Sequence, residues 1–406
     1  MTLSETKAYT HAATTVLDGN EAAAYAAKLC RVEVIAGYPI TPQTPIMEYL
    51  AKLVASGELD ATLVLPEGEH SVMSVVEGAS MAGARTFTAT SGQGLAYMYE
   101  PYYATSTMRL PVVMCLAMRE MAMPWSGWAS HQDAVSVRDA GWIQLYVETV
   151  QEVLDTVIMA YRIAEHPDVL LPVNVCYDGF YVSHYATGVH LPEQEEVDRF
   201  LPPYKADHVF LDPEAPVSVN IAAMPADMMR YRRSHAQAMA QARRVIQEVD
   251  GEFGRVFGRR YGGAVEGYRL EDAETALVTM AGMTGTARVA VDQARDRGAS
   301  VGLLKVRSFR PFPFKEVREA LRGKRAIGVI DRNLCFGWET GVLFVELSAA
   351  LAGMTPFPRI IGFVAGLGGM EVTVADLLGA AGLVQRAAAG QEVPRVTWLG
   401  VEDQVR

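Results

Sequence analysis

The chain has 406 residues, of which 50% are hydrophobic and 20% are charged, and its net charge at pH 7 is −11. This composition is typical of a folded enzyme and argues against a disordered or fibrous chain. No basic run is longer than the pairs Arg232-Arg233 and Arg243-Arg244, so we expect no nucleic-acid partner. At roughly 100 to 200 residues per domain, the length predicts two or three α/β units.

The four cysteines, Cys30, Cys115, Cys176 and Cys335, lie far apart and form no C-x-x-C pair. We therefore expect neither a metal site nor an iron–sulfur cluster in this chain. Residues 1–27 lack the basic start and apolar core of a signal peptide, and no apolar stretch approaches the roughly 18 residues of a membrane span. We expect a cytoplasmic protein that does not enter a membrane.

Short apolar runs alternate with helical patterns in the first part of the chain. This alternation predicts an α/β domain over residues 1–186, with a mainly parallel sheet and helices on both of its faces. The predicted strands are residues 32–37, 61–65, 86–90, 111–117 and 171–175, and the predicted helices include residues 20–29, 70–82 and 149–164.

The alternation stops over residues 187–263, where proline and acidic residues are frequent. We interpret this segment as an extended connection that wraps the first domain or a partner. It contains a predicted arginine-rich helix over residues 226–248, followed by a glycine-rich stretch. A second, smaller α/β domain is expected over residues 264–406, with strands at 276–280, 301–305, 326–330 and 359–364 and a helix that follows the turn at 282–287 and runs to residue 297.

Two strand-to-helix turns carry candidate ligand contacts, because open α/β sheets bind ligands at the carboxyl ends of their strands. The turn at residues 37–45 contains three prolines, which would hold the Thr41 hydroxyl as a preorganised donor. An ordinary proline-containing connection explains the same pattern. Glu69 begins a helix after the second strand, where it is either a simple first-turn acid or a hydrogen-bond partner for a heterocyclic nitrogen.

Two further strand ends contribute candidates. The turn at residues 88–95 consists of small residues that let the backbone approach a ligand, but it matches neither G-x-G-x-x-G nor a P-loop. Arg119 follows the next strand and suits a bidentate grip on a carboxylate. Trp125 and Trp128 come next, in an apolar loop that borders either a substrate or a partner subunit.

The order of these motifs closely resembles the α subunit of the 2-oxoacid:ferredoxin oxidoreductases, which include the pyruvate, 2-oxoisovalerate and phenylglyoxylate enzymes. The likeness covers most of the chain and is weakest over residues 187–263. It rests on Tyr38-Pro39-Ile40-Thr41-Pro42, Glu69-His70-Ser71, Thr86-Phe87-Thr88-Ala89-Thr90-Ser91 with Gln93-Gly94, Arg119, His131 with Asp133, Arg138-Asp139 with Gly141-Trp142, and residues 162–167, 178–180, 304–313 and 331–333.

This resemblance implies a pyrimidine-binding domain for thiamine diphosphate, followed by a domain similar to the transketolase C-terminal domain. Glu69 matches the family's glutamate, which bonds N1′ of the aminopyrimidine and so promotes loss of the thiazolium C2 proton. Thr41 and Arg119 match the residues that hold the substrate's carboxylate and keto group. The expected catalytic residues are thus Glu69, Thr41 and Arg119, and the other expected cofactor contacts are Pro39, Ile40, Ser91 and Gln93.

The resemblance also implies that the chain is active only in a complex. A β subunit is expected to bind the diphosphate and its Mg²⁺, with a γ subunit and a ferredoxin-like δ subunit beside it. Electrons pass to [4Fe-4S] clusters on partner subunits, and a flavin or NAD subunit is a further candidate partner. Coenzyme A takes the acyl group.

The loop after Arg119 departs from the pyruvate enzymes, which carry a polar or small-apolar loop there. The indoles of Trp125 and Trp128 would give the substrate an aromatic face, which favours phenylglyoxylate and benzoyl-CoA as substrate and product. Pyruvate and branched-chain 2-oxoacids are alternatives, because the same tryptophans can pack against a partner. His131 and Asp133 are further candidate site residues, either for proton transfer or for fixing the loop.

Two other functions are compatible with the fold. A non-catalytic assembly subunit is expected to have lost Glu69 or Arg119, and both are present. Non-oxidative decarboxylation or carboligation would require no electron-transfer partner, so co-purifying iron–sulfur subunits would distinguish it from the oxidoreductase.

Overall fold

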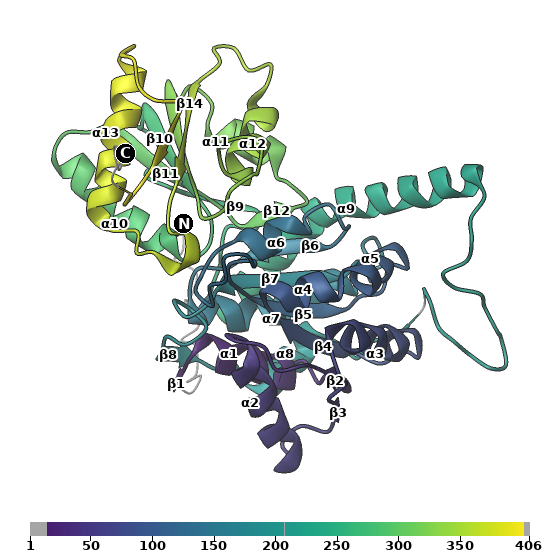
Figure 1. Cartoon of the computed structure of the whole chain (residues 1–406). Coiled ribbons are helices and arrows are strands. Elements are labelled where there is room, and N and C mark those ends of the chain that lie inside the picture. The colour runs from purple at the N-terminus through teal and green to yellow at the C-terminus, as the bar shows by residue number, and fades with distance from the viewer. Residues whose placement is uncertain (1–13, 207, 402–406) are drawn as a thin grey trace, which may run out of the picture.

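The computed structural model describes residues 14–206 and 208–401, which contain two large sheets (Figure 1). In this described part, the larger sheet has seven strands in the order β12-β6-β7-β5-β4-β2-β3. Every neighbouring pair is parallel except β12 and β6. The strands are β2 Val34–Ala36, β3 Thr62–Val64, β4 Thr86–Thr90, β5 Val113–Met118, β6 Ile143–Tyr146, β7 Val173–Asp178 and β12 Ser308–Arg310.

Helices cover both faces of this sheet because its central strands are apolar on both sides. In β5, Val113 and Ala117 join the core under α1 and α7, whereas Met114 and Met118 join the core under α3 and α5. The predicted parallel α/β architecture is therefore confirmed. The helices are α1 Gly19–Leu29, α2 Thr44–Ala55, α3 Glu69–Met81, α4 Gly92–Tyr97, α5 Tyr99–Thr107, α6 Gln132–Ser136 and α7 Val150–Ala164.

The second sheet has the order β15-β14-β13-β10-β11-β9, in which only β9 runs antiparallel to its neighbour among the described strands. α10 and α13 cover one face, and α11 and α12 cover the other (Figure 1). The elements are β9 Val265–Tyr268, β10 Thr275–Thr279, β11 Val301–Val306, β13 Ala326–Asp331, β14 Arg359–Val364, β15 Val396–Trp398, α10 Met283–Asp296, α11 Phe314–Ala320, α12 Val342–Leu351 and α13 Val374–Ala388.

The segment between the sheets contains β8 (Thr187–His190), which pairs with β1 (Thr14–Leu17), then α8 (Gln194–Phe200) and α9 (Pro225–Phe257). The first half of α9 projects away from the body (Figure 1). The helix continues beyond its predicted end at residue 248, because Phe253 and Phe257 are buried against Phe200. Among the described residues, no helix is both long and apolar enough to cross a membrane.

Buried charges join the two sheets. Glu152 on α7 accepts hydrogen bonds from Lys305 Nζ on β11 (2.7 Å) and from Arg307 Nε just beyond it (2.8 Å). Burial by itself raises the pKa of Glu152, but these two cations outweigh it and lower the pKa overall. Strand β12 follows at once and pairs with β6, so the second unit is tied into the first sheet.

Replacing Glu152 with glutamine is expected to lower the free energy of unfolding by about 3 kcal/mol, because it leaves buried Arg307 without a counter-charge and removes one of the carboxylates close to Lys305, another being Glu148 at 3.1 Å. Denaturant titration of the complex purified through this chain measures the change. The folded-state pKa of Glu152 is lowered, so its contribution is present above the pKa of an unfolded glutamate, roughly 4.3, and is lost as the pH falls further.

The matched control is Glu58→Gln, which removes a surface ion pair with Lys28 and should change stability far less. Equal losses in the two variants would contradict a structural role for the buried pairs.

Candidate functional site

The candidate site lies at the carboxyl edge of the first sheet. Thr41 follows β2, Glu69 begins α3 after β3, Gln93 lies in the first turn of α4 after β4, and Arg119 follows β5. The carboxyl ends of parallel strands meet at one edge, so the topology brings these four residues together. Three of the four turns are joined by direct hydrogen bonds.

Arg119 makes these bonds. Its Nη1 donates to the main-chain oxygen of Thr41 (2.6 Å), and its Nη2 donates to Oε1 of Gln93. The guanidinium thus ends between two strand-end turns, with only 4% of the residue exposed. The expectation for Thr41 concerned its hydroxyl. In the structure its carbonyl faces Arg119, and the residue is exposed.

Glu69 is 6% exposed. Burial raises the pKa of its carboxyl above the ordinary value, while its own backbone N–H and the charge of Arg119 act in the opposite direction. Gly94 packs directly against this carboxylate: a Cβ at position 94 would lie 2.5 Å from Oε1 of Glu69 and 2.4 Å from Oγ1 of Thr90. Glycine is therefore required at position 94 for Glu69 and Thr90 to keep these positions.

Several buried polar atoms on β4 and just beyond the ends of β4 and β5 have no hydrogen-bond partner among the described residues. They are Oγ1 of Thr88, Oγ1 of Thr90, Nε2 of Gln93 and Nε of Arg119. Buried polar groups are normally paired, so unpaired ones clustered beside a carboxylate fit a ligand with several donors and acceptors. The sequence signal for the threonines was their period of two in a strand that is otherwise apolar, and it was missed.

The remaining expected cofactor contacts differ in exposure. Pro39 is exposed and Ile40 is partly exposed at the rim of the turn. Ser91 is buried, and its hydroxyl donates to the main-chain oxygen of Ala117 (2.8 Å), which ties the end of β4 to β5. The Ser91 side chain is therefore already engaged within the sheet.

His131 and Asp133 are both fully buried. Nε2 of His131 lies 2.9 Å from Oδ1 of Asp178 at the end of β7, and Oδ2 of Asp178 accepts a hydrogen bond from Gly282 N in the second unit (2.9 Å). Burial raises the pKa of Asp178, but Arg332 and His131 outweigh it and lower the pKa to about 2. This cluster secures the second unit to the site.

The two tryptophans have different surroundings. Trp125 is 64% exposed and Trp128 is 52% exposed. The centre of the Trp125 ring lies 5.7 Å from the guanidinium carbon of Arg119. The Trp128 ring lies 4.3 Å from Phe180, and Gly369 packs closely against it. Trp125 is therefore the indole that borders the site, whereas Trp128 packs where the two units meet.

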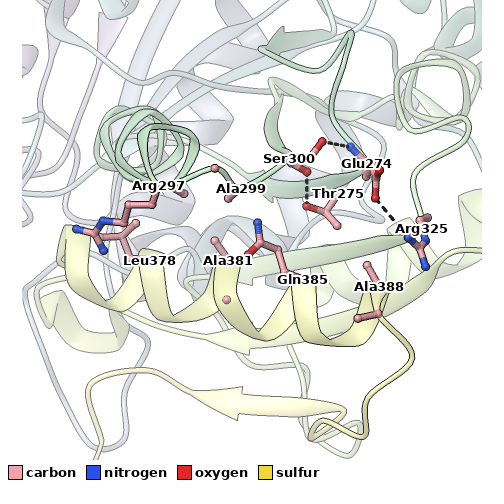
Figure 2. A pocket seen from close by; sticks show the side chains of 14 residues that line it. Glu274, Thr275, Arg297, Ala299, Ser300, Arg325, Leu378, Ala381, Gln385 and Ala388 are labelled. Carbon is pink, nitrogen blue, oxygen red and sulfur yellow. Dashed lines mark hydrogen bonds and ion pairs between the residues drawn. The ribbon is translucent and has the colours of Figure 1, made fainter.

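A cavity of about 420 Å³ lies elsewhere, between α10 and α13 (Figure 2). Its polar groups include Thr275 and Ser300, which lie at the amino ends of β10 and β11, and Thr275 Oγ1 donates to the main-chain oxygen of Ser300 (2.9 Å). It is at the opposite edge of its sheet from the strand ends that face the site. No group of three or more His, Cys, Asp or Glu side chains able to hold a metal occurs in the described ranges.

The first sheet thus has a buried glutamate at its carboxyl edge, and a second α/β unit follows it. The family described as "Pyruvate flavodoxin/ferredoxin oxidoreductase, thiamine diP-bdg" matches residues 25–251, and "Pyruvate:ferredoxin oxidoreductase core domain II" matches residues 273–377. The chain belongs to the 2-oxoacid:ferredoxin oxidoreductase α-subunit family, which confirms the resemblance seen in the sequence.

Two relatives are similar over nearly the whole chain. The NADH-dependent phenylglyoxylate dehydrogenase subunit alpha of Aromatoleum evansii is 46% identical over 88% of this chain and 87% of its own length. The pyruvate synthase subunit PorA of Methanocaldococcus jannaschii is 44% identical over 96% of this chain and 98% of its own. The family is therefore established, and its members differ in substrate.

Solved structures support the fold. The 2-oxoglutarate:ferredoxin oxidoreductase from Magnetococcus marinus has a TM-score of 0.70 at 20% identity and matches 90% of this chain and 64% of that one, so this chain spans less than two thirds of its length. A split gene transketolase has a TM-score of 0.55 at 13% identity, over 93% of this chain and 99% of that one. The expected likeness to transketolase is thus seen at the level of the fold.

Gly94→Ala is expected to weaken thiamine diphosphate binding by about tenfold or more, since the new Cβ would displace the side chains of Glu69 and Thr90. Calorimetric titration of the cofactor-stripped complex measures the affinity. Gly78→Ala on α3, where the Cβ meets nothing within 4 Å, is the matched control. Unchanged affinity in the Gly94 variant would place the cofactor elsewhere.

Proposed function

We propose that this chain is the α subunit of a CoA-acylating oxidoreductase that converts phenylglyoxylate into benzoyl-CoA. In the balanced reaction, phenylglyoxylate, coenzyme A and two one-electron acceptors give benzoyl-CoA, carbon dioxide, two reduced acceptors and one proton. The carbon–carbon bond to the carboxylate breaks, and the acyl carbon forms a bond to the thiol sulfur.

The single observation that carries this proposal is the position of Trp125 over Arg119, 5.7 Å from ring to guanidinium carbon. Phenylglyoxylate carries its carboxylate and its phenyl ring on the same keto carbon, so a cation and an indole side by side match both groups. The identity of 46% with a phenylglyoxylate dehydrogenase α subunit supports the same choice.

The residues of the site have distinct roles in the proposal. When bound, thiamine diphosphate supplies a nucleophilic carbon that holds the electron pair left behind by carbon dioxide. The Glu69 carboxyl would hold a proton shared with a pyrimidine nitrogen, and its burial strengthens that bond. Arg119 would hold the substrate carboxylate with help from Thr41, while Gln93 orients the guanidinium.

Other parts of the family pattern enter as proposals. Residues 1–186 would form the pyrimidine-binding domain, residues 187–263 a connection, and residues 264–406 the transketolase C-terminal-like domain. A β subunit would bind the diphosphate and Mg²⁺, with γ and δ subunits, [4Fe-4S] clusters and a flavin or NAD subunit completing a cytoplasmic complex.

Pyruvate is the second candidate substrate, because PorA relatives match the chain over 96% of its length at 44 and 45% identity. The two candidates predict different preferences in one assay. Anaerobic dye reduction by the complex, with coenzyme A and either 2-oxoacid, should be faster with phenylglyoxylate. Faster reduction with pyruvate would assign Trp125 to packing, and no reduction with any 2-oxoacid would overturn the oxidoreductase proposal.

Trp125→Ala is expected to lower kcat/KM for phenylglyoxylate roughly tenfold relative to kcat/KM for pyruvate, because only the aromatic substrate loses a ring contact. Steady-state kinetics with both substrates gives this ratio. Trp128→Ala is the comparison, since that ring packs on Phe180 and its loss should leave the ratio unchanged. The same change of ratio in both variants would contradict the assignment of Trp125.

A further inference from the structure

Asp133 connects two strand ends through a single oxygen atom. Its Oδ2 accepts hydrogen bonds from the backbone N–H of Gly92 (2.9 Å), which follows β4, and of Arg119 (3.0 Å), which follows β5. Its Oδ1 accepts from the backbone N–H of Ala134 (2.7 Å). Both oxygens are thus occupied by main-chain donors.

The location of Asp133 argues against direct contact with a substrate. The residue has no exposed surface, and burial raises the pKa of its carboxyl to about 7, against the effect of its three main-chain donors and of Arg119. Both of its oxygens accept main-chain hydrogen bonds, so neither is presented to a substrate. Its effect reaches the site through the groups that it binds.

Those groups are in immediate contact with each other. Gly92 has a φ of +46°, and a Cβ at this position would lie 2.4 Å from Nε of Arg119. The Gly92 backbone therefore lies directly against the guanidinium, and the spacing of β4 and β5 at this edge determines where the Arg119 side chain points. A displacement of about 1 Å at a site of this kind is enough to cost two orders of magnitude in rate.

We propose that Asp133 is a positioning residue, whose carboxylate locks Gly92 to Arg119 so that the guanidinium faces the same space as Glu69. The inference deepens the proposed function, on which it rests for the role of Arg119 in holding the 2-oxoacid. Asp133 acts through the position of its oxygen and not through its charge. The donors are main-chain N–H groups, and a charged or a neutral oxygen can accept their hydrogen bonds.

Two substitutions of Asp133, by asparagine and by alanine, distinguish the effect of the acceptor oxygen from the effect of the negative charge. Asp133→Asn keeps an oxygen for Gly92 and Arg119 when its amide oxygen takes the place of Oδ2. Its NH2 group then faces the Ala134 N–H, which loses its acceptor and must move away from a second donor. Asp133→Ala leaves both N–H groups buried without an acceptor. Asp250→Ala is the matched control, because Asp250 is also buried and accepts the Tyr261 N–H (2.8 Å) but lies on α9, away from the site.

The first experiment is steady-state kinetics of the complex with its 2-oxoacid and coenzyme A. Asp133→Ala should raise KM for the 2-oxoacid roughly tenfold to hundredfold and leave KM for coenzyme A unchanged. Asp133→Asn should stay within about threefold of the wild type, since the bridging acceptor is kept, and Asp250→Ala should leave both KM values unchanged. If Asp133→Asn raises KM as much as Asp133→Ala does, the charge of Asp133 matters. If Asp250→Ala raises KM as much, Asp133 only contributes to general stability. Either result overturns the proposal.

A second readout does not depend on activity. Hydrogen–deuterium exchange of the complex should be faster in Asp133→Ala for peptides that contain Gly92 and Arg119, and unchanged there in Asp250→Ala. Unchanged exchange in Asp133→Ala would contradict the proposal that Asp133 holds the two strand ends together. If the wild-type complex oxidises no 2-oxoacid, the proposed function fails, while the exchange data still decide whether Asp133 holds the two strand ends.

Discussion

The site depends on the need of one buried cation for acceptors. Arg119 is almost fully buried, and burial lowers the pKa of its guanidinium, so holding this charge out of water is costly unless oxygen atoms surround it. Thr41 and Gln93 supply these oxygens from two other turns. Three strand ends must therefore converge on one point, and the same convergence places Glu69 beside the guanidinium.

Buried charged residues also fix the position of the second unit against the first. Glu152 holds Lys305 and Arg307, while Asp178 holds His131 and lies close to Arg332. The loop with Trp125 is held from the same side, since Ala129 O accepts a hydrogen bond from Gly369 N (2.8 Å) in the second unit. The second unit thus shapes the wall of a site whose chemistry belongs to the first.

The parts of this structure that follow from local pattern were predictable. The apolar runs gave β2 to β5 and β7, and placing Glu69 and Arg119 after strands brought them to one edge. β6 was missed because Gln144 interrupts its apolar run. That side chain is buried and donates to the Ala134 main-chain oxygen, a contact that no local pattern indicates. The burial of Asp133 and the Thr41 carbonyl facing Arg119 likewise depend on contacts between distant segments.

In the proposed function, the buried Glu69 carboxyl activates a thiamine diphosphate bound beside Arg119. Proton exchange at C2 of the bound cofactor, measured by quenched-flow NMR in the complex, tests it most directly. We expect exchange to be slower by about a hundredfold in Glu69→Gln than in the wild type, because the amide cannot share a proton with the pyrimidine nitrogen in the same way. Equal exchange rates in the two proteins would contradict this role of Glu69.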